Sequence, residues 1–391
     1  MADLRAFRAV HYTGPLEPVL APPYDVLTDQ QVAEYRAQSP HNVVHLTRPG
    51  ADYSGAARLL DEWLAAGVLV EDTEPAMYLH TTEWDGRSRQ DLIAALRLVP
   101  YEERVVLPHE ATHRGPKEDR LALFRATRTC LEPLWFVTEG LRPLLDAAPG
   151  EGRSLSPAQS GEYPAKPGEG AVAFTYAGER HTLRRVTDTD WIARISGYMA
   201  GQPVLIADGH HRYETALAYS EEVGGGPDAS SRFTLALLTD LSDPGLVVLP
   251  THRLLKTGVA VTGGEPTGSL DETLNALHGR VAAGAYRDGR FQVLPLEGEV
   301  PVMELHRQVL DNILGKRSAE EYLRYTRDPE EAVRWVDSGV GVAAFFLDAP
   351  DLGAVLQVAR EGKTMPQKTT YFFPKPPSGM VFHRLDRERN L

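Results

Sequence analysis

The stretch Pro203-Val204-Leu205-Ile206-Ala207-Asp208-Gly209-His210-His211-Arg212-Tyr213-Glu214 decides the fold class. It begins with an apolar run, passes through polar residues, and continues into a helix-forming segment that stops at three consecutive glycines, 224–226. This order predicts a buried strand, a tight turn and a helix. The first N–H groups of a helix lack partners and the helix dipole is positive there, so residues 208–212, hereafter the Asp208 turn, are a candidate anion site.

Working outward, the length and composition indicate a globular protein of several domains. The chain has 391 residues, of which 42% are hydrophobic and 24% charged, and chains of this length usually divide. Strand and helix patterns predict an α/β (α+β) fold. The expected parts are an N-terminal α/β region at 1–145, a turn-rich linker or surface excursion at 146–170, a core segment with the Asp208 turn at 171–260, and a C-terminal α/β region at 261–391.

Hydrophobic periodicity and turn residues predict the individual elements. Helices are expected over 30–37, 53–67, 119–128, 187–199 and 329–337, and strands over 41–46, 76–82, 90–98, 233–238 and 342–347. A hairpin turn is expected at Trp84-Asp85-Gly86, because Asp-Gly suits the tight turns that join antiparallel strands.

Net charge and cysteine content argue against several function classes. The formal net charge of -13 disfavours a nucleic-acid-binding protein, which would carry a basic face. The single cysteine, Cys130, rules out an internal disulfide and a cysteine-based metal cluster, and its apolar neighbours predict a small core residue. No signal peptide and no run of ~20 apolar residues is found, so we expect a cytoplasmic protein that does not cross a membrane.

The residues of the Asp208 turn suit phosphate chemistry. Gly209 allows an unusual backbone angle and the close approach of a ligand, and Arg212 offers planar donors to phosphate oxygens. His210 and His211 can donate hydrogen bonds or move protons near neutral pH. Asp208 can hold Mg²⁺, orient a histidine or accept a proton from a hydroxyl group. The structural alternative is a capped turn with solvated histidines, but five polar or glycine residues between a buried strand and a helix favour function.

A second polar segment runs from Leu107 to Arg120. Pro116 suits a first helical turn, which would place Lys117 and Arg120 on one side, where they can bind a phosphate. Glu110 or Asp119 is then a candidate base or metal ligand; the structural alternative is a solvated helix start. Two histidines spaced by four also match a zinc-binding helix superficially, but the prolines and glycine of the segment argue against such a helix.

Three shorter segments place polar groups near prolines. Met365–Pro376 carries Lys368 and Lys375 around an alternating aromatic strand, which fits either a phosphate contact or an ordinary edge strand. Leu249-Pro250-Thr251-His252-Arg253 and Ala21-Pro22-Pro23-Tyr24-Asp25-Val26 each place polar groups at an element boundary. Rigid turns explain these last two equally well.

Asp208-Gly209-His210-His211-Arg212 resembles the signature of the ParB/sulfiredoxin-like superfamily, in which such a strand–turn–helix binds nucleotide phosphates. The form with two histidines is most similar to free-serine kinases, which convert L-serine to O-phosphoserine. The whole chain resembles a large uncharacterised bacterial and archaeal family, and the resemblance implies a ParB-like core within 171–260. The matching segments are Pro22–Val26, Pro108–Arg120, Ala207–Glu214, Pro250–Arg253 and Met365–Lys375.

These features predict a phosphotransferase that acts on a small hydroxylated metabolite, with L-serine as the leading candidate. The expected donor is ATP, ADP or pyrophosphate, and the expected cofactor is Mg²⁺. The alternatives are a ParB-like CTP- or NTP-binding switch without transfer chemistry, and a phosphate-ester hydrolase. The oligomeric state stays open. The catalytic candidates are Asp208 (also the candidate Mg²⁺ ligand), Glu110 and His210, and the phosphate-binding candidates are Gly209, His211, Arg212, Lys117, Arg120, Lys368, His252 and Arg253.

Overall fold

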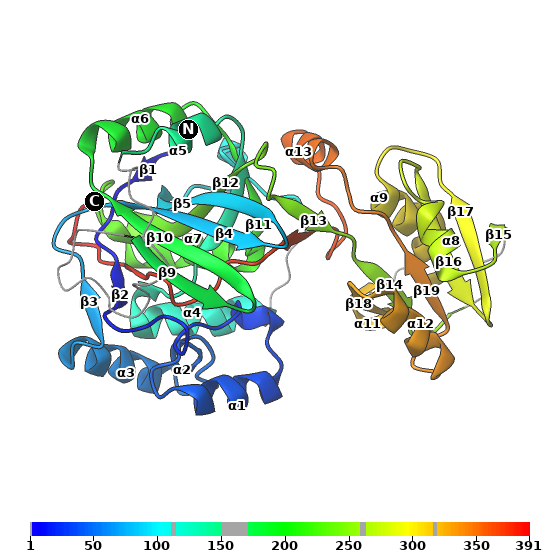
Figure 1. The fold of residues 1–391 in the computed structure, drawn as a ribbon, viewed down its shortest axis with the longest axis horizontal. Coiled ribbons are helices and arrows are strands. Elements are labelled where there is room, and N and C mark those ends of the chain that lie inside the picture. The colour runs from blue at the N-terminus through cyan, green and yellow to red at the C-terminus, as the bar shows by residue number, and fades with distance from the viewer. Residues whose placement is uncertain (1, 111–114, 150–170, 259–262, 316–318) are drawn as a thin grey trace. The chain divides into compact units, whose positions relative to one another are not determined.

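The computed structural model describes residues 2–110, 115–149, 171–258, 263–315 and 319–391. The chain forms two compact units (Figure 1). Unit 1 comprises Met1–Leu107, Thr112–Leu246 and Pro374–Leu391, and unit 2 comprises Pro108–Ala111 and Val247–Phe373. Unit 2 is therefore inserted between parts of unit 1, and the chain returns to unit 1 for its last residues.

Unit 1 is built on a nine-stranded mixed sheet in the order β6-β11-β8-β12-β5-β4-β10-β9, with β1 also paired to β5. The strand that precedes the Asp208 turn, β11, is parallel to β6 and antiparallel to β8. The strands are β1 Leu4–Arg5, β4 Met77–Trp84, β5 Arg87–Arg97, β6 Val106–Leu107, β8 Leu134–Thr138, β9 Ala171–Tyr176, β10 Glu179–Val186, β11 Val204–Asp208 and β12 Phe233–Asp240.

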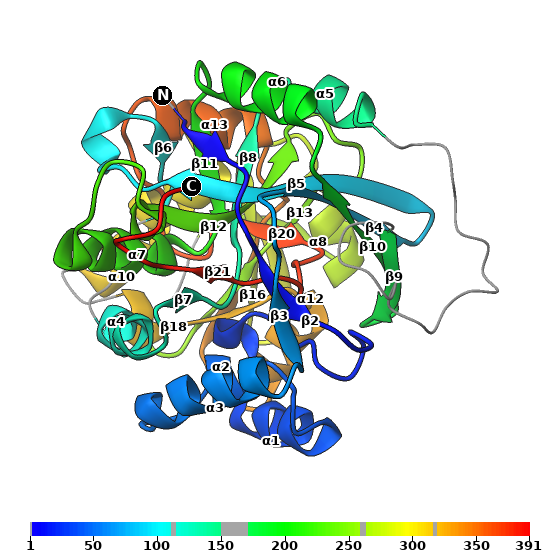
Figure 2. The same ribbon diagram turned by 90° about the vertical axis from the view of Figure 1, so that its left-hand side faces the viewer.

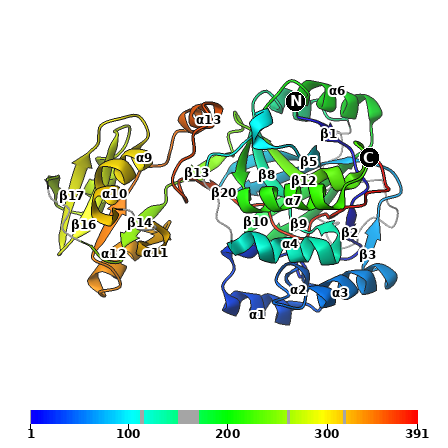
Figure 3. The same ribbon diagram turned by 180° about the vertical axis from the view of Figure 1, so that it is seen from behind.

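Helices surround this sheet, with α4 and α7 packed side by side and α5 and α6 on another side (Figures 2 and 3). The helices are α1 Asp29–Gln38, α2 Val44–Thr47, α3 Tyr53–Ala65, α4 Gly115–Thr127, α5 Arg142–Asp146, α6 Thr189–Met199 and α7 His210–Val223. Short 3₁₀ turns are η1 Tyr24–Val26, η2 Tyr101–Glu103 and η4 Ser230–Arg232. Two small ribbons complete the unit: β2 Val10–Tyr12 with β3 Leu69–Glu71, and β7 Thr129–Cys130 with β21 His383–Arg384.

One face of the sheet forms the main apolar core of unit 1. The Asp188 side chain caps α6 by accepting from the Trp191 backbone N at 2.7 Å. Trp191, Ile195 and Met199 follow at intervals of four, so they share one face of α6 and are buried in this core. Alternate residues of β5 and β8 belong to the same core, because neighbouring strand residues point to opposite faces.

Two residues of β5, Arg89 and Asp91, belong to a buried polar network. The carboxylate of Asp91 lies 3.1 Å from Nδ1 of His80 and accepts from Nε of Arg89 at 2.9 Å, and all three side chains are 0% exposed. The hydroxyl of Thr239 donates to the same carboxylate at 2.5 Å. Nη1 of Arg89 donates to the carbonyl of Pro374 at 2.8 Å. The network thus attaches the returning C-terminal segment to the sheet.

Unit 1 is expected to lose stability when it is acidified. Burial lowers the pKa of both His80 and His383 to about 4, whereas an unfolded histidine has a pKa of about 6.5. Between these values the unfolded chain binds protons that the folded chain does not, so stability falls with pH, by up to about 2 kcal/mol per histidine between pH 6.5 and 5. His11, whose pKa is raised because its contact with Asp72 outweighs burial, opposes part of this loss.

Urea unfolding at pH 7.5 and pH 5.0 checks this expectation. The unfolding midpoint should be lower at pH 5.0. An equal or higher midpoint would show that these buried histidines do not stay neutral in the folded protein.

Unit 2 contains a six-stranded antiparallel sheet in the order β15-β17-β16-β19-β14-β18 and a two-stranded ribbon, β13 with β20. The strands are β13 Val247–Leu249, β14 His252–Leu255, β15 Glu265–Thr267, β16 Ala282–Arg287, β17 Arg290–Pro295, β18 Leu323–Thr326, β19 Ala343–Phe346 and β20 Tyr371–Phe373. The helices are α8 Leu270–Asn275, α9 Pro301–Leu305, the π-helical turn η5 His306–Leu310, α10 Asp311–Leu314, α11 Ala319–Tyr322, α12 Pro329–Asp337 and α13 Leu352–Arg360. Phe346 of β19 and Ala332 of α12 belong to its apolar core.

The mixed α/β class and most predicted elements are confirmed. The hairpin is present, with positive φ at Asp85 and Gly86. The strand expected over 41–46 is wrong, because the buried Asn42 side chain accepts from the Val44 backbone N at 3.0 Å and donates to two carbonyls of the 18–20 turn, which starts the helical turn α2. Among the described residues, no helix is long and apolar enough to cross a membrane.

The compact units do not follow the boundaries expected from the sequence. Strands β10 and β12 pair with β4 and β5, so residues after 170 share one sheet with residues before 145. The main segment of the second unit begins at Val247, before the expected boundary at 260, and the unit also includes Pro108–Ala111. Composition shifts mark surface segments, whereas strand pairing decides which segments share a core. Residues 150–170, most of the expected linker, lie outside the described part of the chain.

Candidate phosphate site at the Asp208 turn

The predicted strand–turn–helix is present in unit 1. Strand β11 ends at Asp208, and α7 begins at His210, three residues before the helix expected from Tyr213. Gly209 is the N-cap residue and has left-handed backbone angles of φ 103° and ψ 29°. A Cβ atom on it would lie 2.7 Å from Cδ2 of Leu134 and 3.1 Å from Nη2 of Arg212. Both the backbone angle and the lack of space therefore require glycine here.

A Gly209→Ala variant is expected to destabilise unit 1 by about 2–4 kcal/mol, because left-handed strain adds about 1–2 kcal/mol to the cost of overpacking. Gly86→Ala is a matched control, since Gly86 also has positive φ but a Cβ there would meet nothing within 4 Å. Urea unfolding of both variants measures the difference. Equal destabilisation would mean that Leu134 and Arg212 do not close around the turn.

The carboxylate of Asp208 holds two cations. Its Oδ2 accepts from Nη2 of Arg212 at 2.7 Å, and its Oδ1 accepts from Nζ of Lys375. The Asp208, Arg212 and Lys375 side chains are 15%, 8% and 11% exposed, so the group lies largely out of solvent. A second donor of Arg212, Nη1, is fixed on the carbonyl of Pro133 at 2.8 Å. These bonds fix the orientation of the guanidinium.

Charge around Arg212 keeps it cationic. Burial by itself would lower the pKa of Arg212, but the carboxylates of Glu132, Asp208 and Asp25 outweigh burial, and the net pKa is raised. His210 beside it is buried, and His211 is partly exposed. The first turn of α7 therefore presents a permanent cation together with two imidazoles.

The part of the second predicted segment that lies in α4 meets α7 within unit 1. Lys117 of α4 forms an ion pair with Glu214, which lies in the second turn of α7. Arg120, one turn further along α4, donates to the carbonyl of Thr47 at 2.7 Å and pairs with Asp119. Its guanidinium lies 4.1 Å from the centre of the Tyr24 ring. Lys117 thus has a carboxylate partner, and Arg120 is held on an aromatic face.

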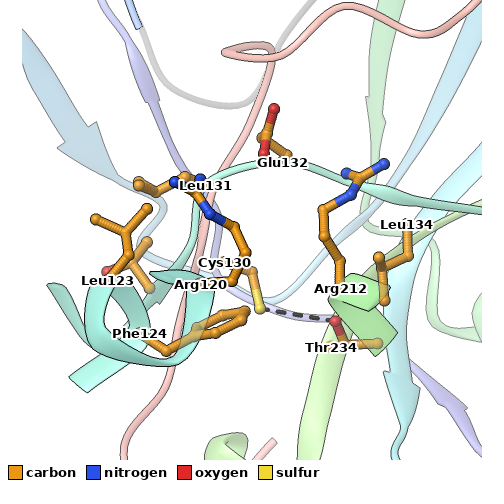
Figure 4. Close-up of a pocket in the computed structure, with 10 residues that line it drawn as sticks. Arg120, Leu123, Phe124, Cys130, Leu131, Glu132, Leu134, Arg212 and Thr234 are labelled. Atoms are coloured by element: carbon orange, nitrogen blue, oxygen red, sulfur yellow. Dashed lines mark hydrogen bonds between the residues drawn. The ribbon is translucent and has the colours of Figure 1, made fainter. Parts of the chain in front are cut away.

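Arg120 and Arg212 line the same pocket, which opens to solvent (Figure 4). Glu132 lies at this pocket, and its Oε1 accepts from the Tyr24 backbone N at 2.9 Å and from the Ser378 hydroxyl at 2.8 Å. The turn at residues 21–26, which the sequence explains equally well as a rigid turn, therefore contributes to this site. Burial raises the pKa of Cys130 to about 11, as expected for a core thiol.

The remaining sequence-predicted residues lie in unit 2. Oε1 of Glu110 accepts from the backbone N of Thr369 at 3.0 Å and of Thr370 at 3.4 Å. The ring of the preceding residue, His109, is buried, and its Nε2 lies 2.8 Å from the Thr370 hydroxyl. The segments 108–110 and 365–370, which the sequence leaves unconnected, therefore meet in unit 2. Lys368 lies in a turn within the second of these segments and is exposed, with a left-handed φ of 55°.

His252 and Arg253 have structural partners rather than faces open to a phosphate. Arg253 is 0% exposed and donates to the carbonyls of Thr251 at 2.7 Å and Lys368 at 3.3 Å. Burial lowers its pKa to about 10 and that of His252 to about 4. The neutral His252 ring accepts from the Leu347 backbone N through Nδ1 at 3.4 Å. In this structure both side chains are buried and Arg253 supports the 366–370 turn, so neither is placed for the expected contact with a phosphate.

The expected Mg²⁺ ligand is not supported by the geometry. Each oxygen of Asp208 already accepts from a cation, and among the residues that the structure describes no group of three His, Cys, Asp or Glu side chains is placed to hold a metal ion. The segment of the zinc alternative falls partly on residues 111–114, which lie outside the described residues.

Fold and site thus define a mixed α/β protein with a cationic helix N-terminus. The chain belongs to the family described as "Protein of unknown function (DUF1015)", whose model matches residues 4–328. This confirms the resemblance to an uncharacterised family. No curated protein matches the chain.

Several solved structures are similar to this chain at low identity. A free serine kinase in complex with AMP is 14% identical over 72% of this chain and 89% of that chain, with a TM-score of 0.40. A conserved hypothetical protein from Pyrococcus furiosus is 16% identical over 71% and 90%, with a TM-score of 0.37. SbnI with a C-terminal truncation from Staphylococcus aureus is 10% identical over 74% and 87%, with a TM-score of 0.33. Values this low assign no activity, so function rests on the site itself.

Proposed function

We propose that this protein is a phosphotransferase that moves a phosphoryl group to a small hydroxylated metabolite, with L-serine as the favoured acceptor. The proposed donor is ATP, ADP or pyrophosphate, bound by its phosphates at the Asp208 turn. The observation that carries the proposal is the Asp208 carboxylate, which holds Arg212 and Lys375 together at the N-terminus of α7.

Phosphoryl transfer depends mainly on positioning and on stabilising negative charge, and this turn supplies both. The N-terminal N–H groups of α7 and its dipole favour a phosphate. Gly209 has no side chain to block that approach. Arg212 and Lys375 bring two positive charges, and Asp208 acts as the residue that positions them, so its role differs from that of a general base.

Glu110 is the proposed general base on chemical grounds. Only one of its carboxylate oxygens, Oε1, accepts hydrogen bonds from described residues. The second oxygen therefore keeps its capacity to accept a proton from a hydroxyl group. A Glu110→Gln variant, which preserves the contacts of Oε1 but removes the charge, tests this role by the loss of turnover with unchanged donor binding.

Transfer is tested by incubating the full chain with L-serine, MgCl₂ and each donor in turn, and by following O-phosphoserine with ³¹P NMR. The proposal expects product with at least one donor. Binding of a nucleotide without product from any hydroxylated acceptor would instead indicate a nucleotide-binding switch. Release of inorganic phosphate at the same rate with and without acceptor would indicate a hydrolase. Either result would overturn the proposed function.

A further inference from the structure

The pocket between α4 and the start of α7 carries opposite charges. The Glu132 carboxylate raises the pKa of Arg212, but no direct hydrogen bond joins the two side chains. Glu132 is 9% exposed, and glutamate is rarely so buried without a cationic partner. Yet it forms no ion pair with any described residue, and its only hydrogen bonds are those to Oε1 from Tyr24 and Ser378. Its Oε2 therefore lacks a donor among the described residues.

The cations of the pocket also keep unused donors. Arg212 donates one N–H to the carbonyl of Pro133 and one to the carboxylate of Asp208. Its Nε–H and the second N–H of each terminal nitrogen have no acceptor in the described part of the chain. Figure 4 shows the Glu132 carboxylate between the guanidinium groups of Arg120 and Arg212 at one end of the pocket. A carboxylate acceptor and guanidinium donors thus face one space without contacting each other.

We infer that this pocket binds a small α-amino acid as a zwitterion, with its ammonium group on Oε2 of Glu132 and its carboxylate on Arg212. Such a ligand satisfies both sets of unused groups at once. A polyphosphate would satisfy only the guanidinium and would meet the Glu132 charge, so the Glu132 end of the pocket is distinct from the proposed donor site, with which the pocket shares Arg212. Arg120 adds a second positive charge beside the ligand carboxylate.

The rest of the pocket limits the side chain of the ligand. Leu123, Phe124 and Leu134 line its other end together with Cys130 and Thr234. Burying a charge against such a surface is costly. The pocket therefore accepts L-serine, L-threonine or L-alanine and rejects L-aspartate and L-lysine.

This inference rests on the proposed function only for the hydroxyl group of the ligand; ammonium and carboxylate recognition stands on the pocket alone. Because Arg212 also holds Asp208, an acceptor bound here would lie next to the residue that positions the donor-binding cations. Binding is measured without any phosphate donor, so the two proposals can fail separately.

The test is titration calorimetry of the full chain with L-serine and with 3-hydroxypropionate, which lacks only the ammonium group. In the wild type, L-serine should bind about tenfold or more tightly than 3-hydroxypropionate, since a hydrogen-bonded charge pair contributes at least that factor. Glu132→Gln should weaken the binding of L-serine by a similar factor. It should leave the binding of 3-hydroxypropionate unchanged or make it tighter. Glu222→Gln, on the exposed end of α7 beside Arg125, is the matched control and should not affect either ligand.

Two results would overturn the inference. Equal weakening of both ligands by Glu132→Gln would show that Glu132 does not contact the ammonium group. Absence of L-serine binding to the folded wild type would show that the pocket does not take an amino acid. Loss of phosphoryl transfer with amino-acid binding intact would leave the inference standing and refute the proposed function alone.

Discussion

An Arg212→Ala variant is expected to lose phosphoryl transfer by about 100- to 1000-fold or more, the size of effect that follows removal of one charge-stabilising donor. The guanidinium is held on Asp208 and on the Pro133 carbonyl, so the substitution removes a fixed cation from the proposed phosphate site. Steady-state O-phosphoserine formation measures the effect.

Two further variants separate this effect from unfolding. Arg125→Ala removes an exposed arginine of α4 whose ion-pair partner among the described residues is Glu222, and it should keep full activity. Arg212→Lys retains the charge but loses the planar arrangement of donors, so it should recover part of the rate at most. Normal turnover by a folded Arg212→Ala protein would refute the role of the Asp208 turn.

The largest effect on stability is expected from Asp91→Ala. Its carboxylate is the common partner of Arg89, His80 and Thr239, and Arg89 and His80 are completely buried. Removing one partner of a buried ion pair leaves an uncompensated charge and costs about 3–5 kcal/mol. Urea unfolding of the variant measures the loss.

A double variant, Arg89→Met with Asp91→Leu, provides the control for that result. Replacing both charges by apolar groups removes the orphaned guanidinium, so the double variant should be more stable than Asp91→Ala. If it is less stable, the network contributes through its geometry rather than through charge pairing. Because Arg89 also holds the carbonyl of Pro374, the residue before Lys375, transfer activity should fall in the double variant, which removes this contact.

The Asp208 turn illustrates what local sequence can predict. The apolar run before Asp208, the glycine after it and the helix-forming segment that follows are all local features, and the structure has that order. The helix starts earlier than expected because Gly209 serves as the N-cap in a left-handed conformation. Likewise, local pattern predicts α3 and α12 nearly to the residue.

Contacts between distant segments could not be predicted in this way. Lys375 reaches Asp208 because the chain returns from unit 2, and nothing in its local sequence distinguishes it from Lys368, which lies in unit 2. Glu132 is not part of any sequence motif. Its place at the pocket becomes apparent only once the chain brings Tyr24 and Ser378 within hydrogen-bonding distance of it. Phosphate-binding roles were expected for His252 and Arg253 without regard to the burial of their side chains. That burial depends on the whole sheet of unit 2 and cannot be read from local sequence.

The central claim is that the Asp208 turn binds the phosphates of the donor. A crystal structure of the full chain grown with ADP, and a second with pyrophosphate, tests it most directly. We predict a phosphate group at the backbone N–H groups that begin α7, within hydrogen-bonding distance of Arg212 and Lys375. Density for the phosphates at another place, or an unchanged Asp208 turn in a crystal where the ligand is clearly bound elsewhere, would contradict it.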